Sequence, residues 1–249
     1  MTTQQLKQFK ILLVGDNCLD VYQYGTIDRL SPEAPVPVFV PTYTEERNGM
    51  GGNVYKNLKA LNCDVHYFFK ETSTKTRFID IRSKQQLIRI DADIISEPLM
   101  FDHDLPDVYD AIVVSDYNKG TVSYELIEEL IGLSIPIFID TKKTDLERFQ
   151  GAWIKINELE YSKIKSECSG LIVTHGAKGA SIKALDIECP ALNVEVSDVT
   201  GAGDTFLAAL TFEYLNTKNI EKAVKFAIRA SAITVQHIGV YSPTLEEIQ

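Results

Sequence analysis

The chain has 249 residues, of which 45% are hydrophobic and 24% are charged, and its formal net charge is -10 at pH 7. This length suffices for one substantial core, and no apolar run approaches the ~20 residues that a membrane-spanning helix needs. An acidic chain repels the phosphate backbone of nucleic acids, so an anionic ligand would require basic groups gathered locally.

Several features indicate a reduced, cytoplasmic protein. The cysteines Cys18, Cys63, Cys168 and Cys189 are scattered and form no C-x-x-C pair, which makes a zinc site improbable. The first residues run directly into a strand pattern, so we expect no secretion signal. The Asp-His-Asp string at 102–104 could mimic metal ligands, but its acidic loop favours a solvated segment.

Short apolar strand patterns alternate with helical patterns along the chain. The strand patterns are "KILLVGD", "VHYFF", "YDAIVVSD", "IPIFIDT", "AWIKIN" and "GLIVTHG". The helical patterns are "GGNVYKNLKALN", "SYELIEELIGL", "GDTFLAALTFEYL" and "IEKAVKFAIRASAITVQHI". This alternation predicts an α/β fold with a central, mostly parallel sheet.

Two segments interrupt the alternation, at approximately 21–47 and 74–95. The first is rich in Pro, Val, Tyr and Thr, and its prolines permit only an edge strand or an irregular ribbon. The second alternates apolar and polar residues, as a half-exposed antiparallel strand does. We expect the two to pair into a small protruding β-lid, and a second copy of the chain to cover its apolar face in a homodimer.

A glycine-rich turn opens the first helical pattern. Gly49, Gly51 and Gly52 come just before Asn53, and glycine lets a ligand approach the backbone closely. The turn has neither the G-x-x-x-x-G-K-[ST] spacing of a P-loop nor G-x-G-x-x-G. A Walker-type NTPase and a Rossmann dehydrogenase are therefore disfavoured.

Polar side chains follow five predicted strands in succession. They are Asp16 and Asp20, Asp116 and Lys119, Asp140, Lys142 and Lys143, Asn157 and Glu160, and Thr174 and Gly176. Each alone could be an ordinary loop residue, but ligands bind beyond the carboxyl ends of parallel strands, so the succession favours a functional rim. Lys142 and Lys143 are the best local basic pair for a phosphate; the alternative is a solvated pair of lysines.

The stretch "DVTGAGDTFLAAL" places Asp204 at the start of a helix behind Gly201, Ala202 and Gly203. Small residues let consecutive backbone N–H groups point the same way, and the helix adds its positive end, which makes an anion hole. A carboxylate beside such a hole suits deprotonation of a hydroxyl that attacks a phosphoryl group. The alternative is an aspartate that merely caps the helix.

These motifs together resemble those of the ribokinase-like (PfkB) carbohydrate kinases over nearly the whole chain. "DVTGAGDTF" is similar to the family's C-terminal signature and "GMGGNVYKNLKALN" to its N-terminal glycine signature. "NELE" matches N-x-x-E, and "VTHGAKGAS" resembles the nucleotide-binding T-x-G-x-x-G loop. The resemblance implies a three-layer ribokinase-like fold in a single domain, residues 1–249, with the β-lid.

A closer resemblance is to the kinase half of the bacterial bifunctional heptose-phosphate kinase/adenylyltransferases, carried by "RLSPEAPVPVF", "QQLIRID", "VVSDYNKG" and "IDTKKTDLERFQGA". We expect no nucleotidyltransferase domain. The resemblance implies ATP-dependent phosphorylation of the anomeric C1 hydroxyl of heptose 7-phosphate, a lipopolysaccharide precursor. The alternatives are a PfkB kinase for another small sugar or polyol, and a catalytically silent ribokinase-fold scaffold.

The resemblance also implies residue roles. Asp204 would be the catalytic base, and Gly201, Ala202 and Gly203 would form the anion hole. The sugar would be bound by Asp16, Asp20, Gly49, Gly51, Gly52 and Asn53, with Lys142 on the sugar's own phosphate. The nucleotide would be bound by Asn157, Glu160, Thr174, Gly176 and Gly179. Asn157 and Glu160 would organise Mg²⁺ through water, and Asp198 and Thr200 could hold a monovalent cation such as K⁺.

The chain departs from the family pattern in three ways. Met50 stands in the family's diglycine and could reshape the sugar pocket. Ile228 replaces an asparagine of the branch, which puts the adenine contact in doubt. The segments after "VHYFF" and after "NELEYSKIK" are short, so a compact kinase is expected.

Overall fold

The computed structural model describes residues 8–101 and 108–249, so the string at 102–104 lies outside the described residues. An eight-stranded sheet with the order β12-β11-β10-β9-β8-β7-β1-β4 forms the body. All pairings from β4 to β10 are parallel, and β11 and β12 add an antiparallel edge. The predicted α/β fold with a mostly parallel sheet is therefore confirmed.

The elements have the following bounds. The strands of the body are β1 Lys10–Gly15, β4 Asp64–Phe68, β7 Ala111–Asp116, β8 Ile137–Thr141, β9 Trp153–Asn157, β10 Leu171–Thr174, β11 Gly179–Ile182 and β12 Ile187–Pro190. The helices are α1 Gly51–Ala60, α2 Tyr124–Gly132, α3 Glu158–Tyr161, α4 Ala202–Thr217, α5 Ile220–Thr234 and α6 Leu245–Ile248. None of these helices in the described ranges is long and apolar enough to cross a membrane.

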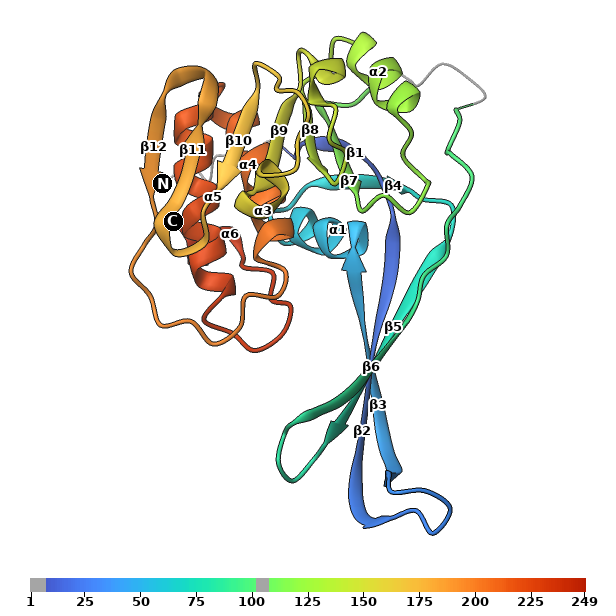
Figure 1. Ribbon diagram of the computed structural model, residues 1–249. Helices are drawn as coiled ribbons and strands as arrows, with labels where there is room; N and C mark the ends of the chain where they lie inside the picture. The colour runs from blue at the N-terminus through green and yellow to red at the C-terminus, as the bar shows by residue number, and fades with distance from the viewer. Residues whose placement is uncertain (1–7, 102–107) are drawn as a thin grey trace.

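The central strands are buried on both faces, because successive side chains point to opposite sides. On β1, Ile11 and Leu13 pack in a cluster with α1, α4 and α5. Leu12 and Val14 pack in a second cluster with α2. Helices thus cover the sheet on both sides, and the carboxyl ends of the parallel strands remain as the edge on which a site can form (Figure 1).

A second, four-stranded sheet projects from the body, and we call it the lid (Figure 1). Its order is β3-β2-β5-β6, with β2 Asn17–Leu30, β3 Pro37–Met50, β5 Thr72–Asp80 and β6 Gln86–Ala92. Residues 21–47 and 74–95 contribute to it. Pro32 and Pro35 lie in the connection between β2 and β3, and Pro37 and Pro41 lie on β3, which is an edge strand as expected. β2 contains no proline and is an inner strand.

Candidate active site

Asp204 lies in the first turn of α4 and is only 7% exposed. Asn53 Nδ2 donates a hydrogen bond to Asp204 Oδ2 at 2.7 Å, and Tyr117 Oη donates to Oδ1 at 3.0 Å. Burial raises the pKa of Asp204 from 3.8 to about 6, although both hydrogen bonds oppose the rise. Such a carboxylate is ionised at pH 7 and basic enough to accept a proton from a hydroxyl.

The glycine turn before Asp204 brings backbone amides and a buried cation to the same place. Gly201 caps α4 with a φ of 80°, in the left-handed region, and a Cβ there would stand 2.7 Å from Asn53 Nδ2. A Cβ on Gly203 would stand 2.8 Å from Lys155 Nζ. The turn, the positive end of α4 and this ammonium make an arrangement suited to an anion.

Lys155 is a site residue that the sequence analysis missed. It lies on β9, is 4% exposed, and its Nζ pairs with Asp140 Oδ2 at 2.6 Å. Burial lowers the pKa of Lys155, but the nearby carboxylates, Asp140 foremost, together outweigh that effect and raise the pKa, so the ammonium stays charged. Asp140 Oδ1 is buried and has no hydrogen-bond partner among the described residues. The sequence contained one signal for this residue: a lysine inside the apolar run "AWIKI". A lysine in a buried strand is almost always paired with an opposite charge.

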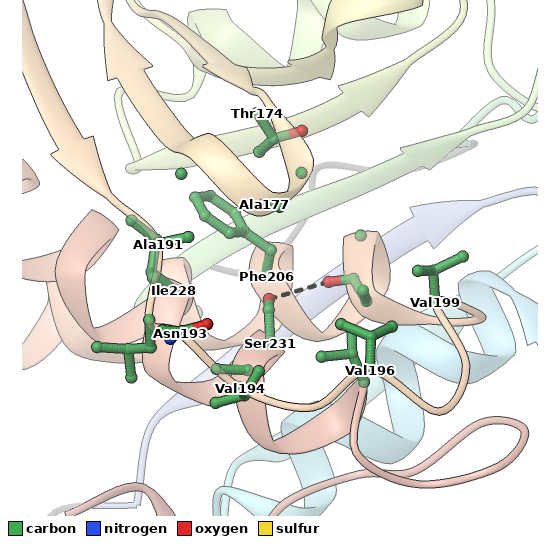
Figure 2. Close-up of a pocket in the computed structure, with 17 residues that line it drawn as sticks. Thr174, Ala177, Ala191, Asn193, Val194, Val196, Val199, Phe206, Ile228 and Ser231 are labelled. Carbon is green, nitrogen blue, oxygen red and sulfur yellow. Dashed lines mark hydrogen bonds between the residues drawn. The ribbon is translucent and has the colours of Figure 1, made fainter.

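A cavity of about 580 Å³ adjoins the glycine turn. Its wall includes Thr174, Gly176 and Gly179 together with Ala202 and Gly203, so three of the five predicted nucleotide residues share one cavity with part of the predicted anion hole. Figure 2 shows the rest of its wall, which is mostly apolar. That wall is formed by Val194, Val196, Val199, Phe206 and Ile228, with Asn193 and Ser231 as polar members. An apolar slot of this size beside an anion hole suits a nucleoside joined to phosphates.

Asn157 and Glu160 begin the short helix α3 as a reciprocal capping box. The Asn157 side chain accepts from Glu160 N at 2.9 Å, and Glu160 Oε2 accepts from Asn157 N at 2.8 Å. Lys142 Nζ pairs with Glu160 Oε1. Lys142 therefore lies with the predicted nucleotide residues. No group of three or more His, Cys, Asp or Glu that could hold a metal directly occurs in residues 8–101 and 108–249.

Asp198 ties the glycine turn to the C-terminal loop. Its Oδ1 accepts from Thr200 N at 2.9 Å and Thr200 Oγ1 at 2.7 Å, and its Oδ2 accepts from Gly239 N at 2.8 Å. Burial alone would raise the pKa of Asp198, but these hydrogen bonds lower it below its usual range. An ionised carboxylate in this loop is a suitable cation ligand.

The predicted sugar residues lie where the lid joins the body. Asp20 on β2 faces Gly49, and a Cβ on Gly49 would collide with the Asp20 carboxylate. Arg77 Nη1 donates to Asp20 Oδ1 at 2.6 Å. Gly52 is similarly close to Asn17, where a Cβ would stand 2.9 Å from Oδ1.

Two of the predicted rim residues have structural partners instead. The Asp16 carboxylate is 1% exposed and accepts from Tyr117 N at 2.8 Å and Lys119 N at 3.0 Å, so it holds the loop after β7 and is not free for a sugar hydroxyl. Lys143 is neither a phosphate ligand nor solvated: it is buried, and its Nζ pairs with Asp116 Oδ2 at 3.1 Å.

The chain is also similar to a known family and to known sequences. Residues 145–248 match the model of the pfkB family carbohydrate kinases. The chain is 33% identical over 300 residues to the bifunctional protein HldE of a Nitratiruptor species, covering 96% of this chain. It is 32% identical over 310 residues to the bifunctional protein HldE of Pasteurella multocida, covering 98% of this chain. The chain spans 64% of the length of each relative.

Solved structures share the ribokinase-like fold. Ribokinase from Arabidopsis thaliana, complexed with ribose and ATP, aligns with a TM-score of 0.71 at 16% identity, covering 97% of this chain and 98% of that one. Ribokinase from Thermotoga maritima aligns with a TM-score of 0.69 at 19% identity, covering 96% of this chain and 98% of that one. The predicted fold class is confirmed by these alignments.

Proposed function

We propose that the chain transfers a phosphoryl group from ATP to the anomeric C1 hydroxyl of heptose 7-phosphate, because residues 145–248 match the pfkB family carbohydrate kinases and the chain is similar to HldE proteins over 96% of its length. The HldE relatives and the motifs shared with that branch support this acceptor. Asp204 would accept the proton of the attacking hydroxyl, and the amides of 201–204 would bind the negative charge of the transferring group.

The observation that carries this proposal is the position of one basic carboxylate. Asp204 is buried, has a pKa of about 6, and follows a glycine turn that borders an apolar cavity of about 580 Å³. A nucleotide in that cavity would bring its phosphates to the turn, next to Lys155. If Asp204 only capped the helix, it would not need to be buried beside the Lys155 ammonium and an anion-binding turn.

The side chains fit ATP and Mg²⁺ as partners of the reaction. The apolar cavity would take the nucleoside, and Mg²⁺ would neutralise phosphate charge. Mg²⁺ commonly binds through substrate phosphates, water and one or two carboxylates. Asp140, whose Oδ2 would lie 3.9 Å from a Cβ on Gly203, and Glu160, which pairs with Lys142, are carboxylates near the proposed phosphate position. Asp198 and Thr200 would hold K⁺ at the loop that they already organise. We further propose a cytoplasmic homodimer formed through the lid.

The experiment is ADP release from ATP-Mg²⁺ with a panel of sugars and sugar phosphates, with Asp204→Asn measured beside the wild type. We expect turnover with heptose 7-phosphate that falls about 10²–10⁴-fold in the variant, whose fold is preserved. An Asn variant with full activity would remove Asp204 from the role of base.

Two other functions have distinct outcomes in the same panel. Turnover of a different sugar or polyol alone, a possibility raised by Met50, would retain the mechanism and replace the substrate. A catalytically silent scaffold would show neither turnover nor thermal stabilisation by ATP-Mg²⁺, whereas a kinase should be stabilised by its nucleotide. Ile228, at the wall of the cavity, is the feature that motivates this second alternative.

A further inference from the structure

Tyr117 connects the proposed catalytic base to the loop that follows β7. Its hydroxyl donates a hydrogen bond to Asp204 Oδ1 at 3.0 Å. Its backbone N–H donates to Asp16 Oδ2 at 2.8 Å, and the Asp16 carboxylate also accepts from the backbone N–H groups of Lys119 and Thr121. The buried Asp16 carboxylate therefore fixes the backbone from which the Tyr117 ring reaches Asp204.

Each carboxylate oxygen of Asp204 accepts a hydrogen bond from a different element. Asn53 Nδ2 of α1 donates to Oδ2 at 2.7 Å, on the side away from Tyr117. Asn57 orients the Asn53 amide, because Asn57 Nδ2 lies 3.4 Å from Asn53 Oδ1 and 2.9 Å from Asn53 O. A carboxylate oxygen has two lone pairs, so either oxygen can still accept from an acceptor hydroxyl. Donors on both sides give the carboxylate one defined orientation.

The Tyr117 phenol stays protonated and remains a donor. Burial, and after it the negative charge of Asp204, raise the pKa of Tyr117 well above its usual range. Lys142 Nζ lies 5.1 Å from the centroid of the Tyr117 ring, and a cation over the ring face draws electron density from the hydroxyl and makes it a stronger donor. Since Lys142 also pairs with Glu160, Tyr117 lies between the predicted nucleotide residues and the base.

Other titratable groups face Asp204 from neighbouring strands. Burial is the largest influence on the pKa of Asp204 and raises it, Asp140 of β8 raises it further, and Lys155 of β9 lowers it. Tyr67 of β4 is a second nearby phenol, but its hydroxyl donates to a backbone carbonyl. Tyr117 is therefore the phenol that stabilises the ionised form of Asp204.

We propose that Tyr117 is a positioning residue for the catalytic base, whose hydroxyl holds Asp204 Oδ1 so that the carboxylate keeps one orientation toward the acceptor hydroxyl. This inference rests on the proposed kinase function and adds a residue that contacts the base instead of the sugar or the nucleotide. In the transfer, the acceptor oxygen forms a bond to the γ-phosphorus, the bond to the departing ADP oxygen breaks, and the acceptor proton passes to Asp204. Tyr117 keeps its own proton throughout.

Tyr117→Phe removes the hydroxyl and retains the ring under Lys142. The matched control is Tyr124→Phe, because the Tyr124 hydroxyl accepts from Asp145 N and its ring packs on the α2 side of the sheet. At pH 8, where Asp204 is ionised, we expect Tyr117→Phe to lower kcat about 10-fold with KM within about 3-fold, because a misoriented base transfers the proton less efficiently. The acid limb of kcat/KM should move up by about one pH unit.

Carboxyl ¹³C NMR of aspartate-labelled protein measures the same titration without acceptor or ATP, and the spectrum of Asp204→Asn assigns the signal. The midpoint of Asp204 should rise in Tyr117→Phe and stay in place in Tyr124→Phe, with the fold of each variant checked by circular dichroism. A purely structural role for Tyr117 would change stability and leave the midpoint and the acid limb where they are.

The proposal is overturned if Tyr117→Phe leaves both the midpoint and the acid limb unchanged, or if it raises KM and leaves kcat intact, since Tyr117 would then bind the acceptor. Failure of the kinase function is a different result. A raised midpoint in Tyr117→Phe, with no ADP released from ATP-Mg²⁺ by the wild type, would sustain the effect of Tyr117 on Asp204 and reject phosphoryl transfer.

Discussion

Asp204 is buried next to two hydrogen-bond donors, and the effect of burial prevails, so its pKa lies at about 6. A base must be unprotonated to accept a proton, and the protonated fraction of Asp204 increases as the pH falls through its pKa. We therefore expect kcat/KM for the sugar substrate to decline about tenfold per pH unit below pH 6 and to be level above it, up to the next titration.

Steady-state kinetics between pH 4.5 and 8 would measure this profile, with the folded fraction checked by circular dichroism at each pH. A profile that stays nearly level down to pH 4.5 would mean that the environment of Asp204 does not raise its pKa in the working enzyme.

The backbone of Met50 is strained. It caps α1 with a φ of 50° and a ψ of -132°, a conformation that glycine adopts far more readily, and its side chain is 4% exposed. Replacing it by alanine removes the side chain and keeps the strain, whereas replacing it by glycine removes both. Met50→Gly should therefore be more stable than Met50→Ala by about 1–3 kcal/mol.

Urea unfolding of the two variants gives this difference directly, since both lose the same buried thioether. Equal stabilities would show that the backbone relaxes at position 50 without cost. The sugar panel on the glycine variant would also reveal whether Met50 restricts the acceptor.

The buried ion pair of Asp140 and Lys155 joins the ends of the neighbouring strands β8 and β9. Removing one member leaves a buried charge without its partner. Lys155→Met alone should lower the free energy of unfolding by about 3–5 kcal/mol. Adding Asp140→Asn should recover part of that loss, because the orphaned charge disappears.

A double-mutant cycle by urea denaturation, with Asp140→Asn as the other single variant, measures the coupling, expected at about 1–3 kcal/mol. Strict additivity of the two single effects would indicate that water already screens the pair.

The long elements of the body follow from the sequence, since β1 and β7 are continuous apolar runs and α5 has a clear helical period. The edge strands β11 (GASI) and β12 (IECP) were not predicted, because neither has the continuous apolar run that marks the equally short β10 (LIVT). The glycine turn and its aspartate were also identifiable, since small residues before a helix have a local chemical meaning.

Partners brought together by folding were not identifiable. Lys155 lies 48 residues before Gly203 in the sequence, and only the folding of the sheet brings its Nζ close to that glycine. Tyr117 reaches Asp204 from the end of β7, and three backbone amides take up the Asp16 carboxylate. The local sequence pattern indicates which residues are candidates for a site. The pairing of strands that are distant in the sequence determines which of those residues come into contact.

For the whole molecule, the two faces of the lid differ in chemistry. One carries Asp20 and the cations opposite it on β3 and β5. On the other, β6 presents Ile88 and Ile90, opposite Phe78 and Thr76 of β5. These isoleucines are 56% and 50% exposed. Large side chains exposed together on an edge strand favour association with another protein surface. A second lid covering this face would leave the cationic face open to a substrate.

We therefore expect sedimentation velocity at micromolar concentration to report twice the mass of the chain, and Ile88→Lys combined with Ile90→Lys to give a monomer. Leu185→Lys, at a site 49% exposed and outside the lid, is the matched control and should remain dimeric. A monomeric wild type would refute dimerisation through the lid. Because the variant charges lie on the lid face opposite Asp20, the monomer should keep the turnover of its sugar substrate, which separates assembly from substrate recognition.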